Sequence, residues 1–443
     1  MRKKGAFFIG RLPNSRWLTP GMGVKRWLLL LGFGALIAGM GFVYVVLVLH
    51  RYNVLPKAAY DALTLQFLPV TWRIVLPLVA GGGIILLAVY GLGHTLLAPF
   101  RRPDEAVSES LYHYSRQGRG PLIVAIGGGT GMPALLRGLR EYTRNITAVV
   151  TVADDGGSSG RLRRDLGLLP PGDFRNNIAA LSRDEALMTQ VLQYRFGGKV
   201  VGGETPEEGD EGNGRSELQG HAFGNLLLAA LTGITGSFDE ALLAAERVLA
   251  LRGRVLPSTL EPVTLAADVA IDGQTRHIVG ESAITEAGGQ IQHLCLEPSA
   301  ARAYPPVLKA ILQADLIVMG PGSLYTSILP NLLIADLATA LQHARAPKVY
   351  ICNLAIQPGE TDNYTVADHV KAILQHLPTN FLDIVLANDN LSVPPQTGGG
   401  HTLYVQPDAP DGVRMITADL VDEKRPWRHD SEKVARAVID LLP

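Results

Sequence analysis

The chain is poor in cysteine and carries no excess of charge. Only two cysteines, Cys295 and Cys352, occur in 443 residues, each within an apolar run typical of a strand. Such isolated thiols predict buried, reduced side chains rather than a disulfide or a metal-binding pair. The formal net charge is −1, with 40 Lys and Arg against 41 Asp and Glu. Because no electrostatic excess would draw the chain onto nucleic acid, we expect no nucleic acid partner.

Several catalytic signatures are also missing from the sequence. We find no Ser/His/Asp arrangement of a hydrolase and no spacing of His and Cys that predicts a metal site. The glycine-rich run at 127–131 is not followed by the Lys-Ser/Thr pair of a Walker A loop. The sequence therefore leaves the catalytic residues unknown.

Long apolar runs are present near the N-terminus. Residues 27–49 and 74–97 contain no charged side chain, and each is long enough to cross a hydrocarbon core of roughly 30 Å as a helix. The second run contains Pro77 and three consecutive glycines, which membrane helices tolerate. A cleaved signal peptide is the alternative for the first run, but its apolar stretch is longer than usual for such a segment. We expect two transmembrane helices.

Lysine and arginine predict the orientation of this hairpin. Seven of these basic residues precede the first run, and Arg101 and Arg102 follow the second. Residues 1–100 are therefore predicted to form a cytoplasmic tail and two membrane helices, followed by a juxtamembrane linker over 101–120. The chain would be a two-pass membrane protein with the remaining domain, 121–443, in the cytoplasm.

That domain has the pattern of an α/β fold. An apolar run at 122–126 leads into the glycine-rich loop, a helical pattern follows, and a second apolar run covers 146–152. Such a unit predicts parallel strands joined by a right-handed crossover. We expect a doubly wound, Rossmann-like, mostly parallel sheet, a flexible loop over 197–219, and an antiparallel β insert over 255–297 that is rich in Val, Thr and Ile.

The glycine-rich loop is the first candidate binding site. It comprises Gly127, Gly128, Gly129, Thr130 and Gly131. Because it joins a strand to a helix, its backbone N–H groups are expected to converge on a phosphate. Met132 stands where a dinucleotide-binding fingerprint has its third glycine, so the motif alone is also compatible with a tight structural turn.

Polar segments follow other predicted strands at the same sheet edge. Asp154, Asp155 and Gly156 follow the second strand, where a carboxylate either binds ribose, holds Mg²⁺ on a diphosphate, or caps the loop. Further candidate ligand contacts lie in predicted edge loops and near the C-terminus: Asn176, His221, Asn225, Gly320, Gly322, Ser323 and Arg428. For His221 and Arg428, a structural hydrogen bond and an exposed helix start are the respective alternatives.

Several long motifs resemble the CofD-like family, and in particular its gluconeogenesis-factor (YvcK-like) branch. They are IGGGTGMPALLRGL, TVADDGGSSGRLR, PPGDFRNN, LQGHAFGNLLLAAL, DLIVMGPGSLYTSILPNLL and CNLAIQPGETDNYTVADHV. The resemblance implies a Rossmann-like fold, binding of UDP-linked sugars such as UDP-N-acetylglucosamine, and a role in cell shape and in growth on gluconeogenic carbon sources. It also implies that Arg428, in an Arg-His-Asp motif, contacts the UDP-sugar.

Three functions compete at this point. The first is a UDP-sugar-binding regulator with protein partners in envelope synthesis, expected to be a homo-oligomer. The second, implied by other members of the family, is a Mg²⁺-dependent 2-phospho-L-lactate transferase, in which Asp154 and Asp155 would be the metal-binding and catalytic residues. The third, an NAD-dependent oxidoreductase, rests only on the first strand–loop–helix unit, and Met132 counts against it.

Overall fold

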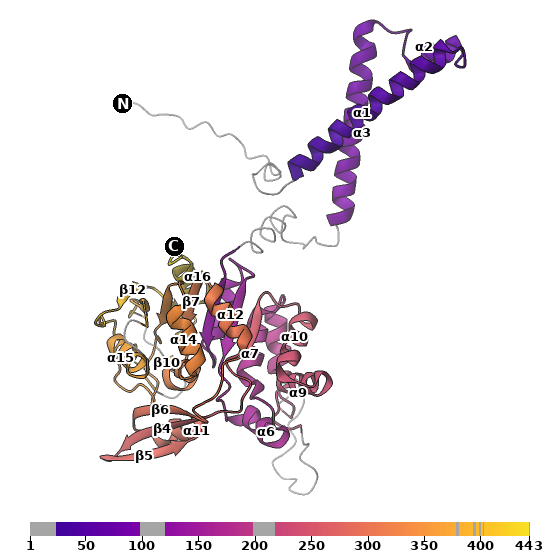
Figure 1. Ribbon diagram of the computed structural model, residues 1–443. Helices are drawn as coiled ribbons and strands as arrows, with labels where there is room; N and C mark the ends of the chain where they lie inside the picture. Colours follow the sequence, from indigo (N-terminus) through magenta and orange to yellow (C-terminus); the bar gives the residue numbers. More distant parts are fainter. Residues whose placement is uncertain are drawn as a thin grey trace, which may run out of the picture. The chain divides into compact units, whose positions relative to one another are not determined.

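The chain divides into two compact units, Met1–Arg116 and Gln117–Pro443. Figure 1 shows the computed structural model, which describes residues 24–97, 120–197, 218–377, 381–392, 396–397, 400–401 and 403–442. The predicted linker at 101–120 and the predicted flexible loop at 197–219 lie almost wholly outside the described residues.

The first unit is helical. Its helices are α1 (Val24–Arg51), α2 (Lys57–Leu63) and α3 (Val70–Leu97). The connection before α3 is held by Arg73, whose guanidinium donates to the carbonyl oxygens of Leu68 and Gln66, both at 2.6 Å. Most described apolar side chains of α1 are exposed, with Met40 at 67% and Tyr44 at 69%, whereas Val46 is buried.

One helix of the described residues is long and apolar enough to cross a membrane, namely Gly32–Arg51 within α1. In α3 the segment Val70–Ile85 is apolar but shorter. Two bent helix pairs of the second unit reach the required length only if each pair counts as one span. The first predicted span, 27–49, thus coincides with a helix that is suited to a membrane by length and composition.

The second unit is built on a seven-stranded parallel sheet with the strand order β12-β9-β8-β7-β1-β2-β3. The strands are β1 (Ile123–Gly127), β2 (Ile146–Val150), β3 (Arg254–Pro257), β7 (Leu316–Met319), β8 (Lys348–Ile351), β9 (Ile384–Asn388) and β12 (Arg414–Ala418). Every residue of β1, β7, β8 and β9 is buried. Continuous apolar strands are expected when helices cover both faces of a parallel sheet.

The helices of this unit connect the strands. They are α5 (Met132–Leu139), α6 (Gly157–Leu166), α7 (Pro171–Leu181), α8 (Glu185–Gln193), α9 (Phe223–Thr235), α10 (Phe238–Val248), α12 (Pro305–Gln313), the π-helix η3 (Leu324–Ile328), α13 (Leu329–Leu332), α14 (Ala335–His343), α15 (Val366–His376) and α16 (Ser431–Ile439). Helix α5 packs against α7 and α16, and α12 packs against α14. The predicted Rossmann-like α/β architecture is confirmed.

The strand order reverses between β1 and β7. On one side of this point the chain runs from β1 to β2 and β3, and on the other it runs from β7 outward to β12. In open α/β sheets, ligands bind beyond the carboxyl ends of the strands at such a reversal. The loops after β1 and β7 are the two glycine-rich segments predicted to bind a ligand.

A separate antiparallel sheet has the order β5-β4-β6. Its elements are β4 (Thr264–Ile271), β5 (Gln274–Val279), α11 (Glu281–Ala287) and β6 (Gln290–Glu297). The predicted insert, 255–297, therefore begins too early, because β3 pairs with β2 in the parallel sheet. Residues 255–271 are rich in Val, Leu and Thr throughout, but Pro257 and Pro262 interrupt their alternation where the chain changes sheets. Two short hairpins complete the unit: β10 (Gln396–Thr397) with β11 (Gly400–His401), and β13 (Val421–Asp422) with β14 (Arg425–His429).

Two segments predicted as loops begin helices instead. The Gly- and Ser-rich segment after Asp154 enters α6 at Gly157, and the segment PPGDFRNN forms the start of α7 with Pro171 in its first turn. Proline suits this position because the first helical N–H has no partner within the helix. Both changes place helix N-termini at the carboxyl edge of the sheet.

Candidate functional site

The two glycine-rich loops lie against each other at the sheet reversal. A Cβ atom added to Gly131 would lie 2.6 Å from the carbonyl oxygen of Pro321, and one added to Gly322 would lie 3.4 Å from that of Gly128. Gly129 and Gly320 have φ angles of +63° and +85°, which favour glycine. The predicted proximity of these loops is confirmed, and their glycines are required by packing as well as by any ligand.

An acidic side chain occupies the amide face of the first loop. The backbone N–H of Gly129 donates a 2.6 Å hydrogen bond to a carboxylate oxygen of Asp173, in the first turn of α7. Burial, with a contribution from the charge of Asp154, raises the pKa of Asp173 to about 6. A phosphate at this amide would therefore compete with a carboxyl group. Asp173 was not predicted as a site residue, although Asn176 of the same segment was, because the contact of Asp173 with Gly129 joins residues 44 positions apart in sequence.

Asp173 belongs to a cluster of three acidic side chains with Asp154 and Glu281. Asp154 accepts a hydrogen bond from the N–H of Gly156 at 2.9 Å. Burial raises the pKa of Glu281 to about 8, and the charges of Asp154 and Asp173 add to this rise. Glu281 comes from α11, more than 120 residues after Asp154 in sequence, and no motif marks it.

The neighbouring carboxylates of Asp154 and Asp155 have different surroundings. Asp155 accepts hydrogen bonds from the backbone N–H and the hydroxyl of Ser282, at 3.0 and 2.8 Å. Asp155 thereby fastens the start of α11, while Asp154 faces the acidic cluster. Within the described residues, no group of three or more His, Cys, Asp or Glu side chains has an arrangement that could hold a metal ion.

A hydrogen-bond network joins three predicted site residues, His221, Asn225 and Asn176. The side-chain amide of Asn225 donates to the hydroxyl of Ser158 at 3.2 Å, and Nδ1 of His221 lies 3.2 Å from the same hydroxyl. Arg175 donates to the side-chain oxygens of Asn225 and Asn176, at 3.0 and 3.1 Å. Ser158 and Arg175, which the sequence analysis missed, therefore link α6, α7 and α9.

Burial lowers the pKa of His221, and the positive charge of Arg161 lowers it further. A neutral imidazole at this position accepts or donates a hydrogen bond without carrying charge. The contacts of His221 within the network therefore match the structural role that was the alternative for this residue.

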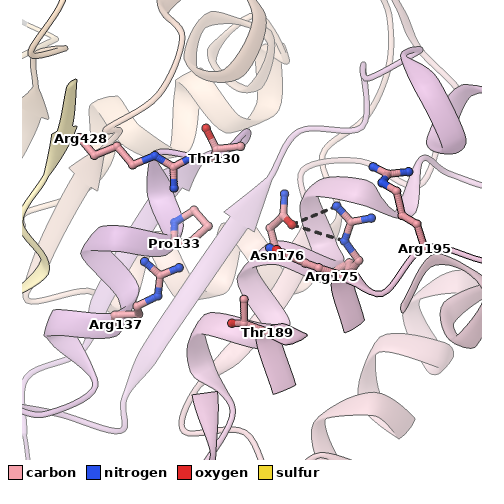
Figure 2. A pocket seen from close by; sticks show the side chains of 9 residues that line it. Thr130, Pro133, Arg137, Arg175, Asn176, Thr189, Arg195 and Arg428 are labelled. Atoms are coloured by element: carbon pink, nitrogen blue, oxygen red, sulfur yellow. Dashed lines mark hydrogen bonds between the residues drawn. The ribbon is translucent and has the colours of Figure 1, made fainter. Parts of the chain in front are cut away.

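Arg175 also lines a pocket of about 280 Å³ beside the first glycine loop. Figure 2 shows the side chains that line it. They are Thr130, Pro133, Arg137, Arg175, Asn176, Thr189, Gln193, Arg195 and Arg428. Of these described residues four are arginines and none is acidic. We call this site the arginine pocket.

The pocket strongly favours an anion. Burial lowers the pKa of Arg428, and the positive charges of Arg425 and Arg137 lower it further. Burial also lowers the pKa of Arg175, and the charge of Arg195 adds to this effect. The guanidinium of Arg137 is paired with Glu185 at 2.7 Å, so part of its charge is compensated. Arginine forks match phosphate oxygens in bidentate geometry, and an anionic ligand would relieve the mutual repulsion of the cations.

The Arg-His-Asp motif places Arg428 in this pocket. His429 is buried and hydrogen-bonds to the backbone of Cys352, just after β8, while its Nε2 has no partner in the described structure. Asp430 caps α16 by accepting from the N–H groups of Glu432 and Lys433, both at 2.9 Å. One residue of the motif thus faces the pocket, and the next two hold its backbone.

The predicted residues are therefore distributed over adjoining parts of one sheet edge. Thr130, Asn176 and Arg428 line the arginine pocket, whereas His221 and Asn225 support it through Ser158 and Arg175. Gly320, Gly322 and Ser323 lie in the second glycine loop, where the Ser323 hydroxyl accepts a 2.8 Å hydrogen bond from Gln357. Arg137 and Arg195 were not predicted, because an isolated arginine on a helical pattern is typical of an exposed surface.

Fold and site define a doubly wound, Rossmann-like α/β protein with a cationic pocket at the carboxyl edge of its sheet. The sequence model of the family described as 2-phospho-L-lactate transferase CofD matches residues 123–435. The chain belongs to this CofD family.

Individual relatives specify the branch. The gluconeogenesis factor of Bacillus subtilis is 44% identical over 334 residues, which cover 73% of this chain and 99% of that protein. A Nostoc sp. relative, also named as a gluconeogenesis factor, is 42% identical over 440 residues, covering 96% of this chain and 91% of the relative. The latter match extends into the first unit. The predicted resemblance to the gluconeogenesis-factor branch is confirmed.

A solved structure shares the fold of the second unit. The crystal structure of a member of the UPF0052 family from Bacillus halodurans is 39% identical, with a TM-score of 0.62. It covers 72% of this chain, and 99% of that protein is matched. A protein corresponding to the second unit alone therefore folds without a counterpart of the first.

Proposed function

We propose that this gluconeogenesis-factor relative binds a nucleotide diphosphate sugar of the UDP-N-acetylglucosamine type in the arginine pocket. The observation that carries the proposal is the convergence of Arg137, Arg175, Arg195 and Arg428 beside the glycine loop, with no acidic side chain among the described lining residues. A diphosphate supplies the oxygens that guanidinium groups bind best. Thr130 and Asn176 add neutral polar groups for hydroxyls of the ligand.

The proposed role is regulatory. The bound sugar nucleotide would report the supply of envelope precursors to a protein partner in envelope synthesis, and so affect cell shape and growth on gluconeogenic carbon sources. The family membership of the chain supports the metabolic part, because its relatives are named gluconeogenesis factors. The proposal includes a homo-oligomeric chain, as the sequence analysis expected.

Calorimetric titration of the full chain in detergent with UDP-N-acetylglucosamine tests the binding step. We expect saturable binding that UDP competes for and uridine does not, because the arginines address the diphosphate. Affinity should fall as salt is added, since screening weakens contacts between exposed charges. An absence of saturable heat with ligand at about 10 mM, where even millimolar binding would register, would remove the proposal.

The acidic cluster beside the first glycine loop supports a second candidate function, a phospholactyl transferase. Mg²⁺ is commonly held by one or two carboxylates together with substrate phosphates, and Asp154 with Glu281 would supply such oxygens. Asp155 is a weaker candidate because Ser282 occupies its carboxylate. If the chain is a transferase, it should form product from a deazaflavin acceptor and a lactyl diphosphonucleoside donor with Mg²⁺. Product no greater than that of Asp154→Ala would reject this candidate.

We further propose that α1 and α3 form a two-pass hairpin that leaves the second unit in the cytoplasm. The uncharged run at 74–97 and the basic residues outside both apolar runs support this topology. Reporter fusions after residue 55 and after the C-terminus test it. A reporter enzyme that is active only outside the cytoplasm should be active when fused after residue 55 and inactive when fused after the C-terminus. Activity of both fusions would contradict the two-pass topology.

A further inference from the structure

A second cavity lies between the antiparallel sheet and α15. Its volume is about 330 Å³, and it is lined by side chains that include Gln290, Gln292, Tyr364, Asp368, Lys371 and Gln375. Figure 1 shows β6 beside α15 in this part of the second unit. We call this site the β6–α15 cleft. It is separate from the arginine pocket, with which it shares no lining residue.

A junction between β6 and α15 lies near the cleft. Nε2 of His376, on α15, accepts a 3.1 Å hydrogen bond from the N–H of Leu294 on the outer edge of β6. The rings of His376 and His293 stack with their centroids 5.6 Å apart. These contacts hold the antiparallel sheet against α15. The cleft therefore lies between two elements that are in direct contact with each other.

A β-bulge directs one residue out of register beside the cleft. In the β4–β6 ladder, Asp268 pairs with His293 and Val269 pairs with Ile291, which leaves Gln292 without an opposite residue. Bulges re-aim side chains and are frequent beside functional sites. The Gln292 side-chain oxygen accepts a hydrogen bond from the Thr275 hydroxyl at 3.0 Å. Gln292 also lines the cleft, where its amide nitrogen is a hydrogen-bond donor for an occupant.

The α15 side of the cleft is polar, and its Lys371 and Gln375 side chains are exposed to solvent. Asp368, Lys371 and Gln375 follow one another at spacings of three and four residues, so they share one face of the helix. The carboxylate of Asp368 already accepts two hydrogen bonds from Thr365, at 3.0 and 2.9 Å. The hydrogen bond from the backbone of Thr365 lowers the pKa of Asp368, and the positive charge of Lys371 lowers it further.

These groups define the chemistry of an occupant. Lys371 is the one cation among the described lining residues, and because Thr365 already binds the carboxylate of Asp368, this lysine favours a single negative charge on an occupant. The glutamine amides offer both donors and acceptors to hydroxyl groups. The Tyr364 ring gives an apolar wall. We propose that the β6–α15 cleft is a second small-molecule site, and that it binds a small hydroxylated carboxylate.

The cleft is connected to the second glycine loop by one hydrogen bond. The hydroxyl of Tyr364 lies 2.8 Å from that of Tyr325, in η3, which begins directly after Ser323. Tyr325 is only 2% exposed, and the next residue, Thr326, donates to Glu360 at 3.4 Å. A ligand that restrains Tyr364 therefore restrains the helix that carries the loop. This link, unlike the cleft itself, rests on the proposed nucleotide-sugar site.

Titration of the full chain in detergent with D-glycerate and D-gluconate tests the cleft. We expect saturable binding of at least one acid, weakened about tenfold by Lys371→Ala because a charge-assisted contact is lost. D-glucose, which has the hydroxyls without the charge, should bind more weakly than D-gluconate. Lys309→Ala, on exposed α12, removes the same charge elsewhere and should leave binding unchanged.

Two results would overturn the site. One is an absence of saturation by either acid at about 10 mM, which corresponds to binding weaker than millimolar. The other is wild-type affinity in Lys371→Ala, with thermal unfolding showing that the variant is folded. Neither result depends on whether UDP-N-acetylglucosamine binds.

The link to the loop has its own test. Saturating acid should change the affinity for UDP-N-acetylglucosamine by about fivefold, the scale of modest coupling between sites, and the nucleotide sugar should change the affinity for the acid by the same factor. Tyr364→Phe removes one hydroxyl and should abolish the coupling while retaining acid binding. If the affinity for UDP-N-acetylglucosamine is the same with and without the acid, the two sites are not coupled. The proposed acid site in the β6–α15 cleft would not be affected by that result.

Discussion

The backbone N–H of Gly129 donates a 2.6 Å hydrogen bond to the carboxylate of Asp173. This contact changes the interpretation of the glycine loop. A glycine-rich turn at a helix start suggests amides that are open to phosphate, but here one amide is already paired with a buried acid. The anion site is therefore better placed in the adjoining arginine pocket, with Thr130 as the shared residue.

Asp173 should destabilise the protein at neutral pH. Its folded pKa of about 6 exceeds the ordinary value of 3.8, so the folded state keeps a proton that the unfolded state releases. The free energy of unfolding should therefore fall as the pH rises from about 4 to 6, by about 3 kcal/mol for two pKa units. Asp173→Asn still accepts from Gly129 and should make this decline shallower, while the part caused by the raised pKa of Glu281 remains.

Urea unfolding of fragment 117–443 at several pH values measures the effect. The control is Asp272→Asn, which changes an aspartate in the β4–β5 turn, away from the acidic cluster. If Asp173→Asn and the wild type lose stability in parallel between pH 4 and pH 6, the buried carboxyl is not the cause.

Gly131 should tolerate no side chain. A Cβ atom at this position would lie 2.6 Å from the Pro321 carbonyl oxygen, so the two loops would have to separate. Gly131→Ala should lower the free energy of unfolding by about 1–3 kcal/mol, the usual cost of overpacking. Gly233→Ala in α9 is the matched control, because nothing lies within 4 Å of its added Cβ and alanine favours helices. Similar losses in both variants would contradict the close contact of the loops.

His429 should act as a positioning residue for Arg428. Burial lowers the pKa of His429 to about 4, so the ring is neutral at pH 7, and the unpaired Nε2 implies that Nδ1 makes the contact with the Cys352 backbone. Asparagine places its amide nitrogen close to the position of Nδ1, whereas glutamine places it one bond further away. We expect His429→Asn to retain the affinity for UDP-N-acetylglucosamine within about threefold, and His429→Gln to lose about tenfold.

Thermal unfolding of the two His429 variants separates positioning from a general loss of structure. Equal midpoints with unequal affinities would support the positioning role. If His429→Gln binds UDP-N-acetylglucosamine as tightly as His429→Asn does, Nδ1 is not the nitrogen that contacts the Cys352 backbone.

The sequence predicted the sheet well because the parallel strands are short, apolar and continuous. The apolar runs at 122–126 and 146–152 correspond to β1 and β2. The start of the β insert was wrong because β3 and β4 share a composition rich in Val, Leu and Thr. The local sign that the chain leaves the parallel sheet is the interruption of the alternation by Pro257, Ser258 and Pro262.

Convergence of distant side chains explains which site residues were missed. Arg137, Arg175 and Arg195 were missed because they come from separate segments and join Arg428 in one pocket only after folding. The same holds for Glu281, which α11 brings to Asp154. Most predicted residues lie within or beside glycine-rich motifs, where the local pattern itself indicates a loop at a strand end, and Arg428 was predicted from the Arg-His-Asp motif of the family resemblance.

The affinity of Arg428→Ala for UDP-N-acetylglucosamine tests the central claim most directly. Arg425→Ala is the control, because Arg425 lies on the same strand and is paired with Asp422 at 3.3 Å, but does not line the pocket. We predict that Arg428→Ala loses about 2 kcal/mol of binding free energy, or about thirtyfold in Kd, and that Arg425→Ala stays within about threefold of the wild type. Equal affinities of Arg428→Ala and the wild type, measured on folded protein, would contradict the assignment of the arginine pocket as the nucleotide-sugar site.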